Sequence, residues 1–129
     1  MTVGMQIKIL SQEFSVCKVA DYSAVDLNAP FTFIGNTDEE NSLVCETVRV
    51  PAKTTERDDG WRGFRIVGVL DFSLIGILSR IATVLAEAKI GIFAVSTFNT
   101  DYVFVKAENF VRALDALAAV GYEVESTFV

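Results

Sequence analysis

One apolar stripe in the second half of the chain constrains the fold more than any other feature of the sequence. Its residues recur at spacings of three and four, which is the period of one face of an α-helix. They are Leu74, Ile77, Leu78, Ile81, Leu85 and Ala88. Asp71 or Ser73 is placed to cap the start of this helix. With a rise of 1.5 Å per residue, a helix of ~15 residues is ~22 Å long and can cross one face of a small sheet.

Four strand-like runs and a second helical pattern surround this stripe. The runs cover residues 61–70, 92–98, 102–106 and 122–128, and the second helix is expected over residues 108–120, with Gly121 in the left-handed position after it. The inner face of the second helix is predicted to hold Phe110, Leu114, Leu117 and Ala118. The order β-α-β-β-α-β predicts an α+β fold of the ferredoxin-like type, in which two helices cover one face of a four-stranded antiparallel sheet.

The strand-like run over residues 92–98 is apolar on both of its faces. Ile92 and Ala94 alternate with Phe93 and Val95, whereas a sheet with one solvated face alternates more cleanly between apolar and polar residues. We therefore expect something to cover part of the second face of the sheet. The N-terminal strands and another copy of the chain are the two candidates.

The first half of the chain has short strands and little helical pattern. The strand-like runs cover residues 6–10, 14–19, 31–35 and 42–46, and one helical turn is possible within residues 20–29. The stretch VPAKTTERDDG, residues 50–60, combines a proline, a glycine and a dense charge run. It predicts a surface loop between two subdomains, about residues 1–59 and 60–129.

Composition narrows the function classes. The chain has 129 residues, a net charge of −6 and no histidine. The acidic balance argues against nucleic acid as a partner, and the lack of histidine removes the commonest general base and the usual nucleophile pairs. Cys17 and Cys45 are interpreted as core residues in a reducing cytoplasm. No signal peptide or membrane helix is predicted, and we expect no catalysis, no metal and no cofactor.

Three stretches of the chain resemble a known family. They are GWRGFRIVGVLDFSLIGIL (60–78), IFAVSTFNTDYVFV (92–105) and TDEENSLVCE (37–46). With STF-x-TDYV after a periodic helix, the chain resembles ACT-domain proteins, the amino-acid-sensing modules of aspartate kinases and many biosynthetic enzymes. It is most similar to small bacterial proteins with two tandem ACT-like halves, which are similar to the ACT domains of the CASTOR arginine sensors. The resemblance implies a reduced ACT-like half over residues 1–59 and a complete ACT domain over residues 60–129.

The resemblance also implies a ligand site between two ACT units. By position in the family's motifs, ligand contacts fall on Thr97, Phe98 and Asp101 of one unit, and on Gly91 and Ile92 of the other. A site composed in this way implies a homodimer.

The start of the first helix adds further candidates for ligand binding. They are Asp71, Ser73, Gly76 and Ile77. A helix N-terminus offers unpaired N–H groups to an anion, such as the carboxylate of an amino acid. Glycine at position 76 lets a ligand approach the backbone, or else it permits close helix–strand packing. Asp71 is as well explained by capping of the helix as by ligand contact.

Two further positions leave alternatives open. Asp101 can accept hydrogen bonds from an ammonium group, or it can form an Asx-turn that caps the hairpin. The turn after the first helix usually reads Ala-Gly-Ile in ACT domains but reads Ala-Lys-Ile-Gly here. Either Lys89 takes the left-handed position, at a cost of ~1 kcal/mol relative to glycine, or Gly91 takes it and the turn lengthens.

The sequence thus predicts a cytoplasmic, non-catalytic regulatory module that binds a free amino acid. The competing hypothesis is a protein interaction module without a small-molecule ligand. Melting the protein in the presence of single amino acids would separate the two, because a ligand of the native state raises its stability.

Overall fold

The computed structural model describes residues 5–67 and 76–125. The chain divides into two compact units, which we call the helical unit (Met1–Ser11 with Arg62–Val129) and the small unit (Gln12–Trp61). Strand β5 (Glu56–Val67) contributes its first half to the small unit and its second half to the helical unit. The boundary at residue 59 was predicted from the sequence and differs from this division. The N-terminal segment Met1–Ser11 belongs to the same unit as the second half of the chain.

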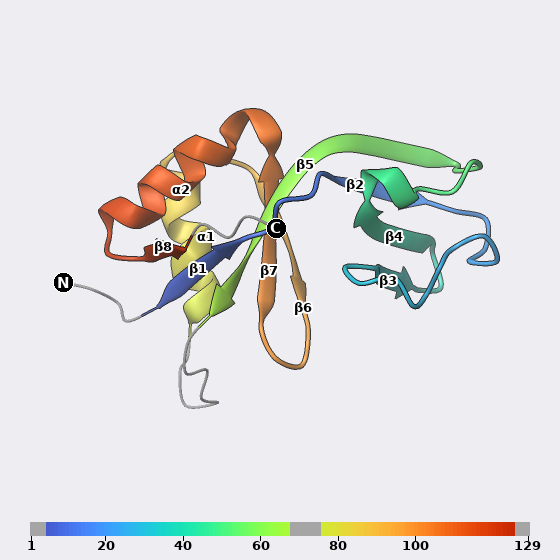
Figure 1. Ribbon diagram of the computed structural model, residues 1–129, viewed down its shortest axis with the longest axis horizontal. Helices are drawn as coiled ribbons and strands as arrows, with labels where there is room; N and C mark the ends of the chain where they lie inside the picture. The colour runs from blue at the N-terminus through green and yellow to red at the C-terminus, as the bar shows by residue number, and fades with distance from the viewer. Residues whose placement is uncertain (1–4, 68–75, 126–129) are drawn as a thin grey trace. The chain divides into compact units, whose positions relative to one another are not determined.

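The helical unit follows the predicted order of elements (Figure 1). After β5 come helix α1 (Ile77–Glu87), strands β6 (Ile92–Ser96) and β7 (Asp101–Lys106), a 3-10 turn η2 (Ala107–Asn109), helix α2 (Phe110–Ala119) and strand β8 (Glu123–Glu125). The α+β class predicted from the sequence is confirmed. Helix α1 begins at Ile77, later than the residue 73 or 74 that the periodicity suggested, and residues 68–75 lie outside the described part of the chain.

The sheet of the helical unit has five strands rather than the predicted four. Its order is β6-β7-β5-β1-β8, with β1 (Gln6–Ile9) between β5 and β8. Ile7 pairs with Ile66 in antiparallel register and with Val124 in parallel register. The side chain of Ile7 is fully buried. The prediction of a four-stranded sheet was therefore wrong by one strand. The pattern near Ile7 does not reveal this strand, because Ile7 is buried through pairing with a residue about 60 positions away.

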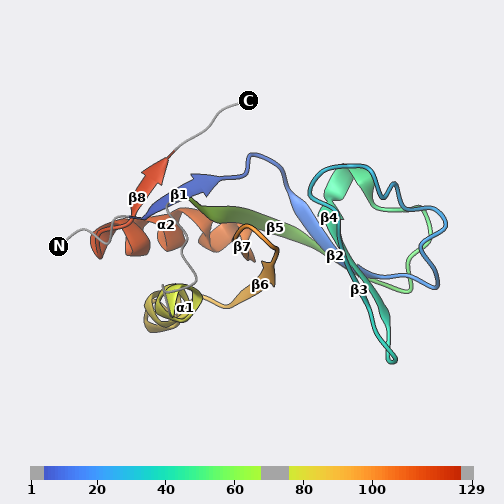
Figure 2. The same cartoon turned by 90° about the horizontal axis from the view of Figure 1, so that it is seen from below.

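Both helices cover the same face of this sheet (Figure 2). Ile81 and Leu85 of α1 are fully buried, as the stripe predicts. In α2 the buried residues are Phe110, Ala113 and Leu117. Ala118, predicted to face inward, is exposed, and Ala113 lies inward instead. The reason is geometric: residues 110, 113 and 117 follow the helical period, whereas residue 118 is turned ~100° away from residue 117.

Both helices end on a residue with a left-handed backbone. Lys89 has φ 62° after α1, and Gly121 has φ 102° after α2. The N–H of Ile90 donates to the carbonyl of Leu85 at 2.9 Å, and the N–H of Tyr122 donates to that of Leu117 at 3.1 Å. These bonds satisfy carbonyls that the helix leaves free. Of the two alternatives for this turn, Lys89 takes the left-handed position and Gly91 does not.

The small unit is a sheet in the order β3-β4-β2-β5. Its further strands are β2 (Phe14–Lys18), β3 (Phe33–Asn36) and β4 (Asn41–Glu46), and a 3-10 turn η1 (Thr47–Arg49) follows β4. One face packs a cluster of Cys17, Val19, Leu43 and Cys45. Both cysteines are unbridged and buried, so their interpretation as core residues is confirmed.

Two local predictions for the small unit were wrong. Residues 56–60 belong to β5 rather than to a surface loop, because they pair with β2: Lys18 lies opposite Glu56, and Cys17 lies opposite Arg57. Backbone pairing stabilises this stretch although it has few apolar side chains. Residues 20–32 form turns and bends rather than a helical turn.

The hairpins β3–β4 and β6–β7 repeat one another. In the first, the N–H of Thr37 donates to the carbonyl of Glu40 at 2.9 Å; in the second, the N–H of Thr97 donates to the carbonyl of Thr100 at 2.9 Å. The hydroxyl of each first threonine also accepts from the last N–H of its turn, at 3.2 Å and 3.3 Å. A strand of six residues and a 3-10 turn follow in both cases. Residue n of the first hairpin therefore corresponds to residue n + 60 of the second.

Candidate functional site

The turn at the end of β6 holds two of the predicted site residues, Thr97 and Phe98. Thr97 closes the turn, since its hydroxyl donates to the carbonyl of Thr100 at 2.9 Å. The strand ends at Ser96, so Thr97 and Phe98 belong to the turn and not to the strand as predicted. The side chain of Phe98 is 94% exposed. An exposed phenylalanine at a hairpin tip can contribute apolar contact area to a binding partner.

Asp101 begins β7 directly opposite Ser96. The hydroxyl of Ser96 donates to Oδ1 of Asp101 at 2.5 Å. The Asx-turn alternative fails, because this acceptor binds a side chain across the hairpin and the turn itself is closed by Thr97. Ser96 thus orients one carboxylate oxygen. The carboxylate of Asp101 can take more than one hydrogen bond, since each oxygen has two lone pairs.

The turn is tied to the end of β5. The hydroxyl of Thr100 donates to the carbonyl of Ile66 at 2.7 Å. Helix α1 begins at the same end of the sheet as the β6–β7 turn, as Figure 1 shows. The first turn of α1 therefore lies at the end of the helical unit that carries Thr97 and Asp101.

Gly76 precedes the helix instead of lying in its first turn. It has φ 79° and ψ 18°, a left-handed backbone that favours glycine. Among the described residues, no atom would lie within 4 Å of a Cβ atom at Gly76, so packing against them does not require glycine there. Ile77 is partly buried against the core of the helical unit. Asp71 and Ser73 lie outside the described residues, and their roles remain predictions.

Gly91 and Ile92 lie at the opposite end of β6. Ile92 pairs with Val105, four positions along the strand from the pair of Ser96 and Asp101. With ~3.3 Å per residue, the two pairs are ~13 Å apart. No atom of residues 5–67 or 76–125 would lie within 4 Å of a Cβ atom at Gly91, so the backbone there is open to an approaching group. The structure brings Gly76, Ile77, Thr97 and Asp101 to one end of the unit and leaves Gly91 and Ile92 at the other.

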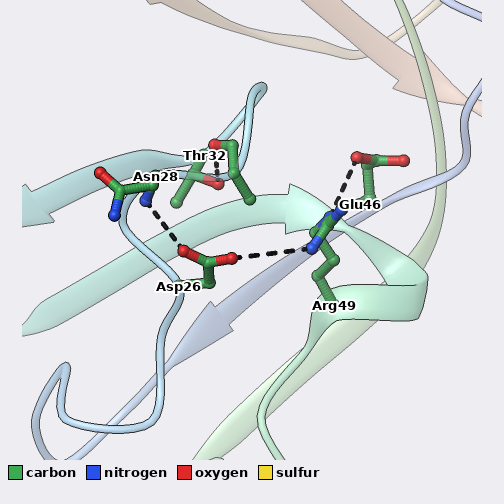
Figure 3. A network of polar contacts seen from close by, with 6 residues as sticks. Asp26, Asn28, Thr32, Glu46 and Arg49 are labelled. Atoms are coloured by element: carbon green, nitrogen blue, oxygen red, sulfur yellow. Dashed lines mark hydrogen bonds and ion pairs between the residues drawn. The ribbon is translucent and has the colours of Figure 1, made fainter.

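A polar network in the small unit was not visible in the sequence (Figure 3). Asp26 accepts from the backbone N–H of Asn28 at 3.0 Å and lies 3.9 Å from the guanidinium of Arg49. Arg49 also lies 3.4 Å from Glu46. These contacts hold the loop over residues 20–32 against η1. The loop places Tyr22 and Val25 over the buried cysteines, so the network is structural.

Within the described residues, no group of three His, Cys, Asp or Glu side chains is arranged to hold a metal ion. No helix in the described part of the chain is long and apolar enough to cross a membrane.

Comparison with known proteins agrees with this geometry. The sequence model of the ACT domain matches residues 56–119, the stretch from the start of β5 to the end of α2. The chain carries an ACT domain. Two strands of the sheet lie outside the matched stretch: β8, the last strand of the ferredoxin-like order, and β1, the added fifth strand. Among curated proteins, none matches the chain in sequence.

Solved structures resemble the chain over almost its whole length. A protein of Agrobacterium tumefaciens is 29% identical, with a TM-score of 0.86 over 97% of this chain and 95% of that one. A Vibrio cholerae protein of unknown function, described as a possible transport protein, is 21% identical, with a TM-score of 0.69 over 92% and 91%. The regulatory subunit of aspartate kinase from Thermus thermophilus is 12% identical, with a TM-score of 0.59 over 92% and 97%. The last two show the shared fold alone.

Proposed function

We propose that the chain is a regulatory module that binds a free amino acid between two copies of itself. One observation carries the proposal: the candidate residues lie in two sets at opposite ends of β6, ~13 Å apart. The ammonium and carboxylate of one amino acid are attached to the same carbon and cannot span that distance. The two sets can hold one ligand only if they come from different copies.

The free edge of β6 offers a way to join two copies. Among the described residues, β6 pairs only with β7, and its sequence IFAVS has neither charge nor proline to block an edge. Antiparallel pairing of two β6 strands, centred on Ala94, sets Ile92 opposite Ser96 of the second copy. Gly91 then lies opposite Thr97 of the second copy. Each of the two equivalent sites combines one strand start with one hairpin turn.

The chemistry of the combined site suits an amino acid. Asp101 accepts hydrogen bonds from the ligand's ammonium group, with charge assistance. The backbone N–H groups at the start of α1, from Ile77 onward, donate to the ligand's carboxylate. Gly91 of the second copy leaves its backbone accessible to the ligand. Ligand binding then favours the paired form, because it stabilises only the state that contains both halves of the site.

The cellular setting and role form part of the proposal. Two buried, unbridged cysteines suit a reducing compartment, the cytoplasm. The structural similarity to the regulatory subunit of an aspartate kinase supports a regulatory rather than a catalytic role. We assign no chemical step, cofactor or nucleic acid to the chain.

The pairing of two β6 strands is tested by placing charged side chains at its central residue, Ala94. Ala94 is exposed, so Ala94→Lys leaves the fold of one copy intact, but in the pair it sets two ammonium groups directly opposite each other. We expect A94K alone and A94E alone to sediment as monomers in analytical ultracentrifugation, and an equimolar mixture to sediment as a dimer. A wild-type monomer at all concentrations, with and without ligand, would refute the pairing.

The ligand is sought by thermal melting against each of the twenty amino acids at 10 mM. One or a few should raise Tm, with a shift that grows with concentration. If none does, the amino-acid function fails.

A second candidate function is a protein interaction module. The fully exposed ring of Phe98 favours it, since an apolar side chain at a hairpin tip can anchor a partner. In that case Phe98→Ala abolishes partner binding while melts with amino acids show no shift.

A further inference from the structure

A hollow on the small unit lies apart from the site at β6. Its volume is about 250 Å³, and it is lined by Val16, Cys17, Lys18, Glu40, Ser42, Glu56, Arg57 and Asp58. All of these residues belong to the small unit. No described residue of the helical unit contributes to the lining, so the small unit of one copy supplies all of the residues that line the hollow.

The floor of the hollow is a row of three side chains on adjacent strands. Lys18 on β2 pairs with Ser42 on β4 and with Glu56 on β5. Residues that pair directly in a sheet project on the same face, so an ammonium group stands between a hydroxyl and a carboxylate. The buried Cys17 and Cys45 cluster packs on the other face. This row therefore lies on the face away from that core.

The repeat of the hairpins explains why space is left there. Ser42 corresponds to Tyr102 in the second hairpin, since each lies five residues after the first threonine of its turn. The phenol oxygen of Tyr102 accepts from Nη1 of Arg65 at 3.4 Å. In the helical unit, a large side chain thus stands on the sheet next to a cation. In the small unit, Ser42 stands beside Lys18. A serine is smaller than the tyrosine at the corresponding position by the volume of an aromatic ring, which leaves space on the sheet.

The lining supplies both kinds of charged partner. No carboxylate lies within 4.0 Å of the Lys18 ammonium in the described part of the chain, so this cation is available to an anion, with the Ser42 hydroxyl beside it. Glu56 on β5 and Glu40 at the start of β4 offer carboxylates on the two sides of Lys18. Arg57 is engaged elsewhere, because its Nε lies 2.8 Å from Asp59. A ligand with one negative and one positive group matches this set.

We propose that the hollow binds a small zwitterion, a free amino acid, as a second site within a single chain. The ligand's carboxylate accepts from Lys18 and Ser42, and its ammonium donates to Glu56 on the neighbouring strand. The site shares only the ligand class of the proposed function. It uses different residues and requires no edge pairing, so either site can exist without the other.

The test maps binding by ¹⁵N NMR on the full chain carrying A94K, in which the edge site is broken. Each of the twenty amino acids is added at 10 mM. We expect at least one to shift the amide signals of Val16, Lys18, Ser42 and Glu56. For the amino acid with the largest effect, the matching amine and the matching deaminated acid should each bind at least ten-fold more weakly. Equal binding of the amine would mean a nonspecific cation effect and would overturn the proposal.

Three variants complete the test. Lys18→Ala should weaken binding at least ten-fold, because a charge-assisted hydrogen bond is lost. Ser42→Tyr, which installs the residue of the second hairpin, should abolish binding. Lys53→Ala removes an exposed lysine outside the hollow and should leave affinity unchanged.

The second site would be overturned if none of the twenty amino acids shifts the amide signals of β2, β4 and β5. It would also be overturned if neither K18A nor S42Y changes the binding affinity. Shifts in wild-type protein confined to residues 91–101 would overturn it as well, while supporting the proposed function.

Discussion

Ser96 and Asp101 face each other across the last pair of the β6–β7 hairpin, and the serine hydroxyl donates to the aspartate Oδ1 at 2.5 Å. This bond holds the Asp101 carboxylate in place before any ligand arrives. A carboxylate that is already oriented loses less conformational entropy on binding.

Asp101→Asn should keep the fold and lose the ligand. The amide is close in size to the carboxylate, but it brings no charge to an ammonium group. We expect the affinity for the best amino acid of the melting screen to fall at least ten-fold, measured by isothermal titration calorimetry. Ser96→Ala is the matched control: it removes the orienting donor and keeps the charge, so its loss should be smaller. Equal affinities of wild type and Asp101→Asn would show that Asp101 has only a structural role.

Lys89→Gly should stabilise the protein. Lys89 holds a left-handed backbone with φ 62°, which costs a residue with a Cβ atom ~1 kcal/mol relative to glycine. The lysine is exposed, so little packing is lost with it. We expect a gain of ~1 kcal/mol in the free energy of unfolding, measured by urea denaturation. Gly121→Ala, the same change in reverse after α2, should destabilise by a similar amount. No gain for K89G would mean that the lysine side chain contributes stability of its own.

Gly63→Ala should destabilise the helical unit. A Cβ atom at residue 63 would lie 2.7 Å from Cε1 of Phe104. That ring cannot easily move, since it is fully buried and stacks on Phe93 with centroids 4.8 Å apart. We expect a loss of ~1–3 kcal/mol, as for other overpacked cores. At Gly35, on an exposed strand, the nearest atom to an added Cβ is 3.6 Å away. Gly35→Ala should therefore change stability by less than ~0.5 kcal/mol.

Stability should fall at alkaline pH through Cys45. Burial raises the pKa of this thiol from its ordinary value of 9.0 to about 11. The folded state thus keeps the proton that the unfolded state releases. The contribution is fully present below pH 9.0 and is lost as the pH rises through about 11. Burial also raises the pKa of Tyr22 and of Tyr122, which adds to the loss in the same direction.

The variant Cys45→Val isolates the thiol, because it keeps a similar volume and the two tyrosines. Urea midpoints of wild type and C45V between pH 7 and 11 are the measurement. Wild type should lose stability relative to C45V above pH 9. Parallel curves over the whole range would show that the thiol does not contribute.

The elements with strong local sequence patterns could be predicted from the sequence. The stripe through Ile81 and Leu85 predicted α1 and its buried face, and the two strand-like runs over residues 92–98 and 102–106 predicted the strands of the β6–β7 hairpin. A helical period and a turn composition are set by residues within a few positions of each other. The motif around Asp101 also pointed to the ACT fold, although it left open whether Asp101 binds a ligand or shapes the turn.

Local pattern failed where pairing decides the structure. Residues 56–60 look like a charged loop, but they extend β5 because β2 offers its backbone to them. Ile7 looks like part of an N-terminal hairpin region, yet it lies between β5 and β8. The partner of a strand depends on residues that are far away in the sequence. The pattern of residues within the strand therefore cannot predict which strand it pairs with.

The order of helices and strands, the apolar faces of α1 and the acidic charge of the chain follow from the residues alone, because each depends on near neighbours or on a simple sum. The position of β1, the ~13 Å along β6 between Ile92 and the Ser96–Asp101 pair, and the hollow beside Lys18 follow only from the folded chain. They depend on sheet register, which brings together side chains far apart in sequence and separates others that belong to one motif.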